Sequence, residues 1–515
     1  MKMNCRILLP LLLLVLTASR CQKGQDQIQL IPLQFEDGTV VLPQETDILS
    51  AAWKDGDSSR FHASDAPVLL DDPARYVYGD EQVGKLVNTD EMILETVVQQ
   101  EDTTFLLRHA SAFIRLELQG LPAGREMSQV QIICTRGEPV FRSFPGIVIP
   151  PEGSLTVWTA LPPQDFSGEG FAVLVHGLDG GLWTVRFPGT RFQGGIACRW
   201  TAACLPHTET ECDLSATPLP QTLLDGVQPG EYSGITWISG DDYAVVSDNL
   251  KGGGIVRFTI PIDADGSVGE VRAEPAPGTK AAGGKAPDSE GIAYADGKLY
   301  VSTEQQQIRE FDLDGRATGK AFRIPADMSV KQIAANRGFE ALTFRGGHFW
   351  TTTEAPLLKD SFLPRVLRLQ RFDRDGKPAG RYFYQTGLPG KSATEAAGAQ
   401  AYVFGVPALS ALDDGRLLVL EREVFVPKGG FLTKLLDSFT ESRIYVVDPV
   451  HDPAGILRKS LLCSFTTGAV DLANYEGMCL GPVLPDGSRT ILLIADSQNG
   501  SGGLTGEYVK VILLR

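Results

Sequence analysis

Acidic side chains recur at equivalent places in the C-terminal half of the chain, and their types and spacing could support metal chemistry. Several segments begin near an acid, pass through a turn and return along an apolar strand that ends in another acid. The two strands of such a hairpin are antiparallel, so the start of the first lies beside the end of the second. We therefore expect three pairs of neighbouring carboxylates: Glu290 with Glu304, Glu340 with Glu354, and Glu476 with Asp496.

A cluster of this kind needs compensation for its charge. Two carboxylates about 5 Å apart repel by roughly 3 kcal/mol at an effective dielectric near 20. Bound cations, raised pKa values or arginines could relieve the repulsion. Oxygen ligands without histidine or cysteine favour Ca²⁺, or else Mg²⁺, over zinc. The candidate metal ligands are Asp248, Asp288, Glu354, Glu421, Glu476 and Asp496, and the candidate catalytic residues are Glu290, Glu304, Glu340, Arg337 and Arg422. Alternatively, these acids accept backbone hydrogen bonds and hold neighbouring strands together.

The acids belong to a repeat, which predicts the elements that position them. Each repeat has three or four short strands, which is typical of a β-propeller blade. In three repeats the third strand ends at an Asp-x-Asp-Gly stretch, which we interpret as a hairpin turn because the rest of a calcium loop is missing. Five repeats predict five blades, and the stretch from Pro378 to Tyr402 leaves a sixth open. The five equivalent segments begin at Ser233, Glu290, Glu340, Pro407 and Glu476. We expect the strand at Pro218–Leu224 to close the ring.

The N-terminal half predicts a second all-β domain. Apolar and polar residues alternate at 113–118, and the strands at 171–175 and 183–187 flank a hairpin turn at Asp179. This pattern favours a β-sandwich over residues 28–205, followed by the propeller over 213–515. His109 and His176 are interpreted as structural polar residues of strands. The run 106–116 resembles the fimbrillin-like domains of anchored bacterial surface proteins, and this resemblance implies a spacer or assembly module with a surface-protein partner.

The first residues indicate export. Lys2 and Arg6 precede an apolar core of about ten residues, half of what spans a bilayer, so 1–21 is predicted to be a signal peptide. Cys21 directly follows, and this arrangement resembles a lipoprotein lipobox. The resemblance implies that Cys21 is lipidated and anchors the chain to the outer membrane of a bacterial cell envelope, facing the periplasm or the exterior. Arg20 departs from the small residue usual before such a cysteine, so a plain secretory signal is the alternative.

Composition excludes one class of partner. The formal net charge is −16. Nucleic-acid binding needs a basic face, so no nucleic-acid partner is expected. The cysteines have no CxxC spacing, and Cys198, Cys204 and Cys212 could include a disulfide.

The acidic segments also carry a family resemblance. Five stretches resemble the esterase-like phytase family, in order, over nearly 300 residues: Asp288-Ser289-Glu290-Gly291, Asn336-Arg337-Gly338-Phe339-Glu340, Leu420-Glu421-Arg422, Asn474-Tyr475-Glu476-Gly477 and Asp496-Ser497-Gln498-Asn499. The resemblance implies a propeller hydrolase comparable to calcium-dependent propeller phytases, which cleave phosphomonoesters.

The sequence leaves three functions open. The leading hypothesis is an anchored, metal-assisted hydrolase that acts on a small-molecule phosphoester or carboxyl ester. No Gly-x-Ser-x-Gly motif occurs, and His348 lies in a turn far from the acids, which argues against serine-histidine chemistry. The second hypothesis is a non-catalytic, calcium-stabilised surface binding module, and the third is a fimbrial accessory protein.

Overall fold

The computed structural model describes most of residues 112–515, and before residue 112 it describes only strands β1 to β5. The longer stretches left out after residue 112 are 135–139, 143–146, 248–253, 281–288, 361–364 and 498–504. The chain divides into two compact units, Met1–His207 and Thr208–Arg515. Nearly all of the described secondary structure is β-strand, as the sequence predicted. Within the described part of the chain, no helix is long and apolar enough to cross a membrane.

The first unit buries one hydrophobic core between two sheets. Their strand orders are β10-β6-β15-β2 and β16-β13-β12-β7-β8, with β9 paired to β7, and β1-β5-β4-β3 and β11-β14 form two further sheets. Ile114 and Leu116 of one sheet and Val173 and Val175 of the other are buried in the same core. The strands are β1 (Gln27–Leu30), β2 (Gln34–Phe35), β3 (Arg60–His62), β4 (Glu91–Gln99), β5 (Asp102–His109), β6 (Ala112–Gln119), β7 (Glu126–Cys134), β8 (Val140–Arg142), β9 (Ile147–Val148), β10 (Leu155–Leu161), β11 (Gln164–Asp165), β12 (Phe171–Gly177), β13 (Leu182–Phe187), β14 (Arg191–Phe192), β15 (Ile196–Ala203) and β16 (Leu205–Pro206).

His176 is a buried histidine of β12, and its ring nitrogen Nε2 lies 2.9 Å from Oε1 of Gln131. Burial lowers the pKa of His176 to about 4. The unfolded chain, whose histidines titrate near about 6.5, therefore takes up a proton first as the pH falls. We expect acidification from about pH 7 to about pH 4 to cost this unit about 3 kcal/mol of unfolding free energy.

Hydrogen exchange of the β12 amides in the full-length chain measures this pH effect. Protection should fall on acidification, and His176→Gln should flatten the pH dependence because glutamine carries no titrating group. An equal pH dependence in the variant would show that His176 does not cause it.

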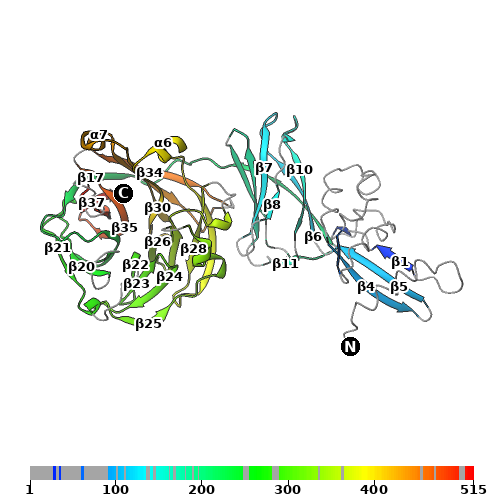
Figure 1. Cartoon of the computed structure of the whole chain (residues 1–515), viewed down its shortest axis with the longest axis horizontal. Helices are drawn as coiled ribbons and strands as arrows, with labels where there is room; N and C mark the ends of the chain where they lie inside the picture. The colour runs from blue at the N-terminus through cyan, green and yellow to red at the C-terminus, as the bar shows by residue number, and fades with distance from the viewer. Residues whose placement is uncertain are drawn as a thin grey trace. The chain divides into compact units, whose positions relative to one another are not determined.

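The second unit contains five sheets of similar build. Three have the orders β18-β19-β20-β21, β22-β23-β24-β25 and β26-β27-β28-β29, the last extended by β33 (Ile456–Leu457). The other two are β30-β31-β32-β34 and β17-β37-β36-β35. The first strands of the five sheets are neighbours in a ring, in the order β18, β22, β26, β30, β35 and back to β18. Figure 1 shows β22, β26 and β35 towards the middle of this unit and β20, β21 and β25 at its edge. This is the arrangement of a β-propeller.

The strands of the second unit take the same places in each sheet. The first strands are β18 (Tyr232–Ser239), β22 (Ser289–Ala295), β26 (Phe339–Arg345), β30 (Ala401–Ala411) and β35 (Asn474–Val483). The second strands are β19 (Asp242–Ser247), β23 (Lys298–Thr303), β27 (His348–Thr353), β31 (Leu417–Val426) and β36 (Arg489–Asp496). The third strands are β20 (Ile255–Thr259), β24 (Gln307–Phe311), β28 (Val366–Phe372), β32 (Phe439–Val447) and β37 (Tyr508–Leu514). The fourth strands are β21 (Arg272–Pro275), β25 (Ala317–Ala321), β29 (Pro378–Gln385), β34 (Lys459–Gly468) and β17 (Ala216–Leu223).

The pairing of the strands tests two predictions about the ring, its closing strand and a possible sixth blade. The prediction that a strand near Pro218–Leu224 closes the ring is confirmed, because β17 pairs antiparallel with the C-terminal strand β37. The stretch from Pro378 to Tyr402, considered for a sixth blade, contains β29 and the short helix α6 (Ala393–Gly398) instead of a sheet of its own. The remaining helices are α7 (Phe431–Asp437) and the 3-10 turns η4 (Pro277–Lys280), η5 (Ala326–Met328), η6 (Val330–Gln332) and η7 (Leu358–Asp360).

The Asp-x-Asp-Gly stretches are hairpin turns, as predicted. Each glycine donates its N–H to the first aspartate's carbonyl, at 2.9 Å in 263–266 and 3.0 Å in both 312–315 and 373–376. Gly266, Gly315 and Gly376 have φ values of 87°, 83° and 73°, a region that favours glycine. The disulfide considered for Cys198, Cys204 and Cys212 is not formed among these three residues.

Candidate functional site

The five repeats meet along one axis of the second unit. The same part of each first strand lines a common narrow cavity, which has room for about one water molecule. The lining residues include Gly234, Gly291, Glu340, Ala408 and Gly477, one from each of the five equivalent segments. Equivalent positions of the five repeats therefore lie at the same depth in the central channel. The acids lie at and around this depth.

Three carboxylates form the densest acidic group at this end of the channel, which we call the acidic triad: Glu290, Glu304 and Glu340. One carboxylate oxygen from each lies within 4.8 Å of the others. Glu304 follows β23 directly, and the other two occupy register irregularities of β22 and β26, where two residues of one strand oppose one of its partner. Gly338 donates its backbone N–H to Oε2 of Glu304 at 2.8 Å.

The electrostatics of the acidic triad are unfavourable when all three groups are charged. Burial, and then the charges of Glu290, Glu354, Glu476 and Glu304, raise the pKa of Glu340 well above its usual value. Glu340 therefore tends to hold a proton unless a positive charge is supplied. Raised pKa values were one of the three forms of relief that the sequence led us to expect.

Arginines provide a second form of relief, next to the acidic triad. Glu354 accepts hydrogen bonds from two of them: Arg422 donates Nη2–H to Oε1 at 2.5 Å, and Arg337 donates Nη1–H to Oε2. Arg422 also donates Nη1–H to Oδ1 of Asn474 at 2.7 Å and to Oε1 of Glu476. Burial acts to lower the pKa of Arg422, but Glu476 and Glu354 more than offset it, so the pKa is raised. Two of the predicted metal ligands, Glu354 and Glu476, are thus already ion-paired.

The two arginines differ in exposure. The side chain of Arg422 is 5% exposed and surrounded by its partners, whereas that of Arg337 is 28% exposed. Arg337 can therefore also reach a molecule at the channel end, while Arg422 serves as a fixed internal counter-charge.

Asp496 lies near the acidic network, but its cross-strand neighbour is not the one predicted. The register places Asn474 opposite Asp496, because the ladder shifts between Tyr475 and Gly477 and leaves Glu476 in the irregularity. Asn474 donates Nδ2–H to Oε1 of Glu476 at 2.9 Å and lies 3.5 Å from Oδ2 of Asp496. Asn474 therefore links the two acids that the sequence expected to be direct neighbours.

Glu421, predicted as a metal ligand, makes its contacts away from the other acids. Successive residues of a strand point to opposite faces, and on β31 Arg422 is the residue that contacts the acids. Glu421 is instead held by Lys459, whose Nζ donates to Oε1 at 2.6 Å, by the N–H of Gly387 at 2.9 Å, and by the hydroxyl of Tyr384. Burial lowers the pKa of Lys459, although Glu421 acts in the opposite direction.

Three predicted residues, Asp248, Asp288 and Cys21, lie outside the described residues. Sequence reasoning missed Glu507, a buried acid next to β37 that accepts hydrogen bonds from the N–H of Gly230 at 2.9 Å and from the hydroxyl of Ser497 at 2.7 Å. Burial raises the pKa of Glu507. Ser497 belongs to a quoted family motif, but Glu507 sits at no repeated position, so no pattern indicated it.

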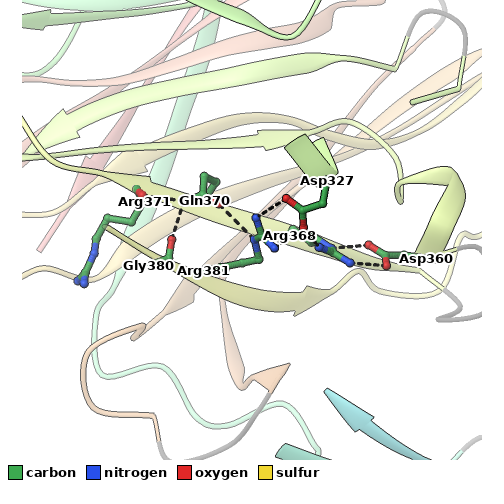
Figure 2. A network of polar contacts seen from close by, with 7 residues as sticks. All are labelled: Asp327, Asp360, Arg368, Gln370, Arg371, Gly380 and Arg381. Carbon is green, nitrogen blue, oxygen red and sulfur yellow. Dashed lines mark hydrogen bonds and ion pairs between the residues drawn. The ribbon is translucent and has the colours of Figure 1, made fainter. Parts of the chain in front are cut away.

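A buried ion network fastens the segment that carries Arg337. Asp327, ten residues earlier, accepts from Arg368 at 2.6 Å and from Arg381 at 2.5 Å and 3.0 Å. Arg368 also donates to both carboxylate oxygens of Asp360, at 2.5 Å and 2.6 Å. Figure 2 shows Arg368 between the two aspartates, with Arg381 beside it. The connection from β25 to β26 is thereby attached to the third sheet, which restricts where Arg337 can lie.

Comparisons with known proteins support a hydrolase-type propeller. Residues 228–498 match the family model described as phytase-like, esterase-like activity of phytase. No curated protein matches the chain. Among solved structures, the chain is similar to a glutaminyl cyclase of Myxococcus xanthus at 11% identity and a TM-score of 0.28, over 59% of this chain and 96% of that one.

Two further solved structures are similar over parts of the chain. The WD40 β-propeller domain of Doa1 is 12% identical with a TM-score of 0.27, over 57% of this chain and 96% of that one. A putative cell adhesion protein from Bacteroides fragilis is 16% identical with a TM-score of 0.15, over 23% of this chain and 53% of that one.

Proposed function

Because the chain belongs to the phytase-like family described by the esterase-like activity of phytase, we propose that its second unit is a metal-assisted hydrolase. Its substrate is a small molecule with a phosphoester or a carboxyl ester, cleaved at the acidic end of the channel. The observation that carries this proposal is the acidic triad, whose three oxygens lie within 4.8 Å of one another.

The acidic triad fits a divalent cation. Its ligand atoms are all carboxylate oxygens, which Ca²⁺ and Mg²⁺ prefer, and Ca²⁺ also accepts the irregular geometry that three different strands provide. The raised pKa of Glu340 supports this assignment, because a bound cation would offset the burial and the neighbouring negative charges that raise it. When bound, such a cation supplies a charge that polarises a phosphoryl or carbonyl oxygen and makes nearby water more acidic.

The protein's own groups have separate roles in this proposal. Glu290 and Glu304 hold the cation. Glu340 holds a proton when no positive charge is near, because its pKa is raised. With a cation beside it, its carboxylate would be free to accept a proton from water and to return it to the leaving group. Arg337, partly exposed and bound to Glu354 by one nitrogen, stabilises the negative charge that develops on the substrate. Arg422 positions Glu354 and Glu476 from within the protein.

The remaining parts of the proposal concern the blade count of the second unit, the role of the N-terminal unit and the membrane anchor. We propose that the five sheets are the five blades of one propeller. The N-terminal unit is proposed to be a fimbrillin-like β-sandwich that acts as a spacer or contacts a surface protein. Lipidated Cys21 would anchor the chain to the outer membrane, facing the periplasm or the exterior.

A second candidate function is a non-catalytic surface binding module stabilised by calcium. The narrowness of the cavity beside Glu340 favours it, because a substrate could reach only the rim of the channel. The arginine partners of Glu354 and Glu476 also favour a structural role for part of the acidic network. A fimbrial accessory protein, the third function considered, would assemble into high-mass polymers that gel filtration detects.

Turnover with and without cation tests the proposal. We expect the full-length protein to hydrolyse an aryl phosphate or an aryl ester in the presence of Ca²⁺, and we expect a chelator to abolish this activity. If Ca²⁺ raises the melting temperature but neither substrate class is turned over, the binding-module function replaces the hydrolase. If the chelator changes neither the melting temperature nor the turnover, a bound cation has no part in either proposed function.

A further inference from the structure

The central channel has a second end, and its chemistry is the opposite of the acidic end. A cavity of about 290 Å³ lies further along the first strands of the five sheets, beyond the acids. Each first strand contributes residues here that come shortly after those lining the narrow cavity. The aromatic residues Trp237, Tyr294 and Phe344 line it, together with hydroxyls, one arginine, Arg345, and one aspartate, Asp296. This cavity lies outside the acidic triad, so it is a separate candidate site.

The cavity wall offers hydroxyl donors. Thr236 and Thr343 each accept a backbone N–H through Oγ1, from Tyr294 at 3.1 Å and from Ala411 at 3.2 Å. A hydroxyl that accepts in this way still has its own O–H to donate. Ser410, almost fully buried, adds another hydroxyl to the lining. The polar part of the wall can therefore donate hydrogen bonds to a negatively charged ligand.

Arg489 is not one of the lining residues, but it supplies positive charge beside Trp237, which is one of them. Its guanidinium carbon lies 5.4 Å from the centroid of the Trp237 ring, and the indole of Trp237 is held by a 2.9 Å hydrogen bond from Nε1–H to the carbonyl of Gly240. Nε and Nη2 of Arg489 are buried and have no hydrogen-bond partner among the described residues. Buried donors without partners are costly, so these groups favour a ligand that accepts hydrogen bonds.

The surrounding charges leave an excess of arginine. Arg345 is paired with the exposed Asp413 at 2.5 Å, and Arg374 is paired with Asp296 at 3.2 Å. Arg489 has no such acid within ion-pair distance among the described residues. Burial, and then the charge of Arg345, lower the pKa of Arg489. An anion placed between Arg345 and Arg489 would relieve both effects.

We propose that this cavity binds a small organic anion that combines an oxyanion, either carboxylate or phosphate, with an aromatic or other apolar group. The oxyanion lies between Arg345 and Arg489 and accepts from the hydroxyls, because a planar guanidinium matches oxyanion geometry. The apolar group packs on Trp237, Tyr294 and Phe344. The two arginines require that the ligand be an anion, and the three aromatic side chains require that it also have an apolar part.

Isothermal titration of the full-length protein with four probes tests the proposal, with a chelator present so that phenyl phosphate is not also hydrolysed at the acidic end. Benzoate and phenyl phosphate should bind, and their relative affinities distinguish carboxylate from phosphate as the preferred oxyanion. Benzyl alcohol, which lacks the charge, and inorganic phosphate, which lacks the ring, should each bind at least ten-fold more weakly than the better of the two. Benzyl alcohol binding as tightly as benzoate would overturn the anion requirement, and no binding of either aromatic anion up to about 10 mM would overturn the site.

Variants locate the site. Arg489→Met should weaken binding of the better probe at least ten-fold, and Arg489→Lys, which keeps the charge, should weaken it less. Arg272→Met removes an exposed arginine whose side chain is 75% exposed, and it should leave binding unchanged. Glu304→Gln changes the opposite end and should also leave binding unchanged, so failure of the hydrolase proposal and failure of this one are distinguishable. Equal binding by wild type and both Arg489 variants would overturn the assignment.

Discussion

Changing both Glu290 and Glu304 to Gln is expected to abolish the response to Ca²⁺ and to reduce hydrolysis at least about 100-fold, as loss of a metal site requires. Without Ca²⁺ the same variant should be more stable than wild type. Without a cation the charged pair is Glu290 and Glu304, whose carboxylate oxygens lie within 4.8 Å of each other. Their repulsion costs roughly 3 kcal/mol at an effective dielectric near 20, and the amides remove it. Wild type at a Ca²⁺ concentration of about 100 times Kd should gain about 2.7 kcal/mol.

Thermal unfolding measures both stability differences: the variant should melt above wild type with chelator and below wild type with added Ca²⁺. The matched control is Glu270→Gln, which removes one carboxylate from a side chain that is 80% exposed, and it should behave as wild type in both conditions. A variant that keeps the full Ca²⁺ shift and full turnover would show that the acidic triad is not the metal site. If wild type turns over neither substrate class and the variant loses the Ca²⁺ shift, the acidic triad is a metal site without catalysis, which would indicate the binding-module function.

Arg422→Met is expected to destabilise the second unit by about 3–5 kcal/mol, which is typical when one partner of a buried ion network is removed. Arg422 is 5% exposed, and its removal leaves Glu354 and Glu476 without their shared counter-charge. Glu354 is left only with Arg337, and Glu476 only with the amide of Asn474, among the contacts described above. The reduction should appear as a lower midpoint of denaturant unfolding, monitored with chelator present so that cation binding does not compensate.

Two further variants make this prediction specific. Arg422→Lys should recover only part of the loss, because lysine cannot contact Glu354 and Glu476 with two nitrogens at once. The triple change Arg422→Met, Glu354→Gln and Glu476→Gln should be more stable than Arg422→Met alone, since it removes the uncompensated charges. A loss below about 1 kcal/mol in Arg422→Met would place this ion network among pairs that contribute little.

The proximity of Glu290 and Glu304 was accessible from the sequence because it depends on one hairpin. Only a short loop separates their strands, and antiparallel pairing brings the two ends together whatever the rest of the chain does. The Asp-x-Asp-Gly turns were accessible for the same reason, since their glycines and aspartates act over four residues. The closing strand β17 could be predicted because the last repeat lacked a fourth strand of its own.

The partners of the acids were not accessible in this way. Arg422 reaches Glu354 across 68 residues and Glu476 across 54, and which face of β31 carries it depends on how the strand is seated in its sheet. Glu421, the residue just before Arg422, lies on the opposite face of β31 and contacts Lys459 and Tyr384 instead. The register shift between Tyr475 and Gly477 likewise put Asn474, not Glu476, opposite Asp496. A shift of one position is invisible in an alternating pattern of residue types but changes every contact.

The recurring acids with which the sequence analysis began now divide into groups with different surroundings. The repeated β-hairpins, the antiparallel partners within each hairpin and hence the concentration of acids at one end of the strands follow from local residue patterns. Which acids are neutralised by arginine, which one contacts a lysine instead and which three remain together depends on the folded chain. That division depends on packing between sheets, where charges separated by many residues in the chain come within a few ångströms.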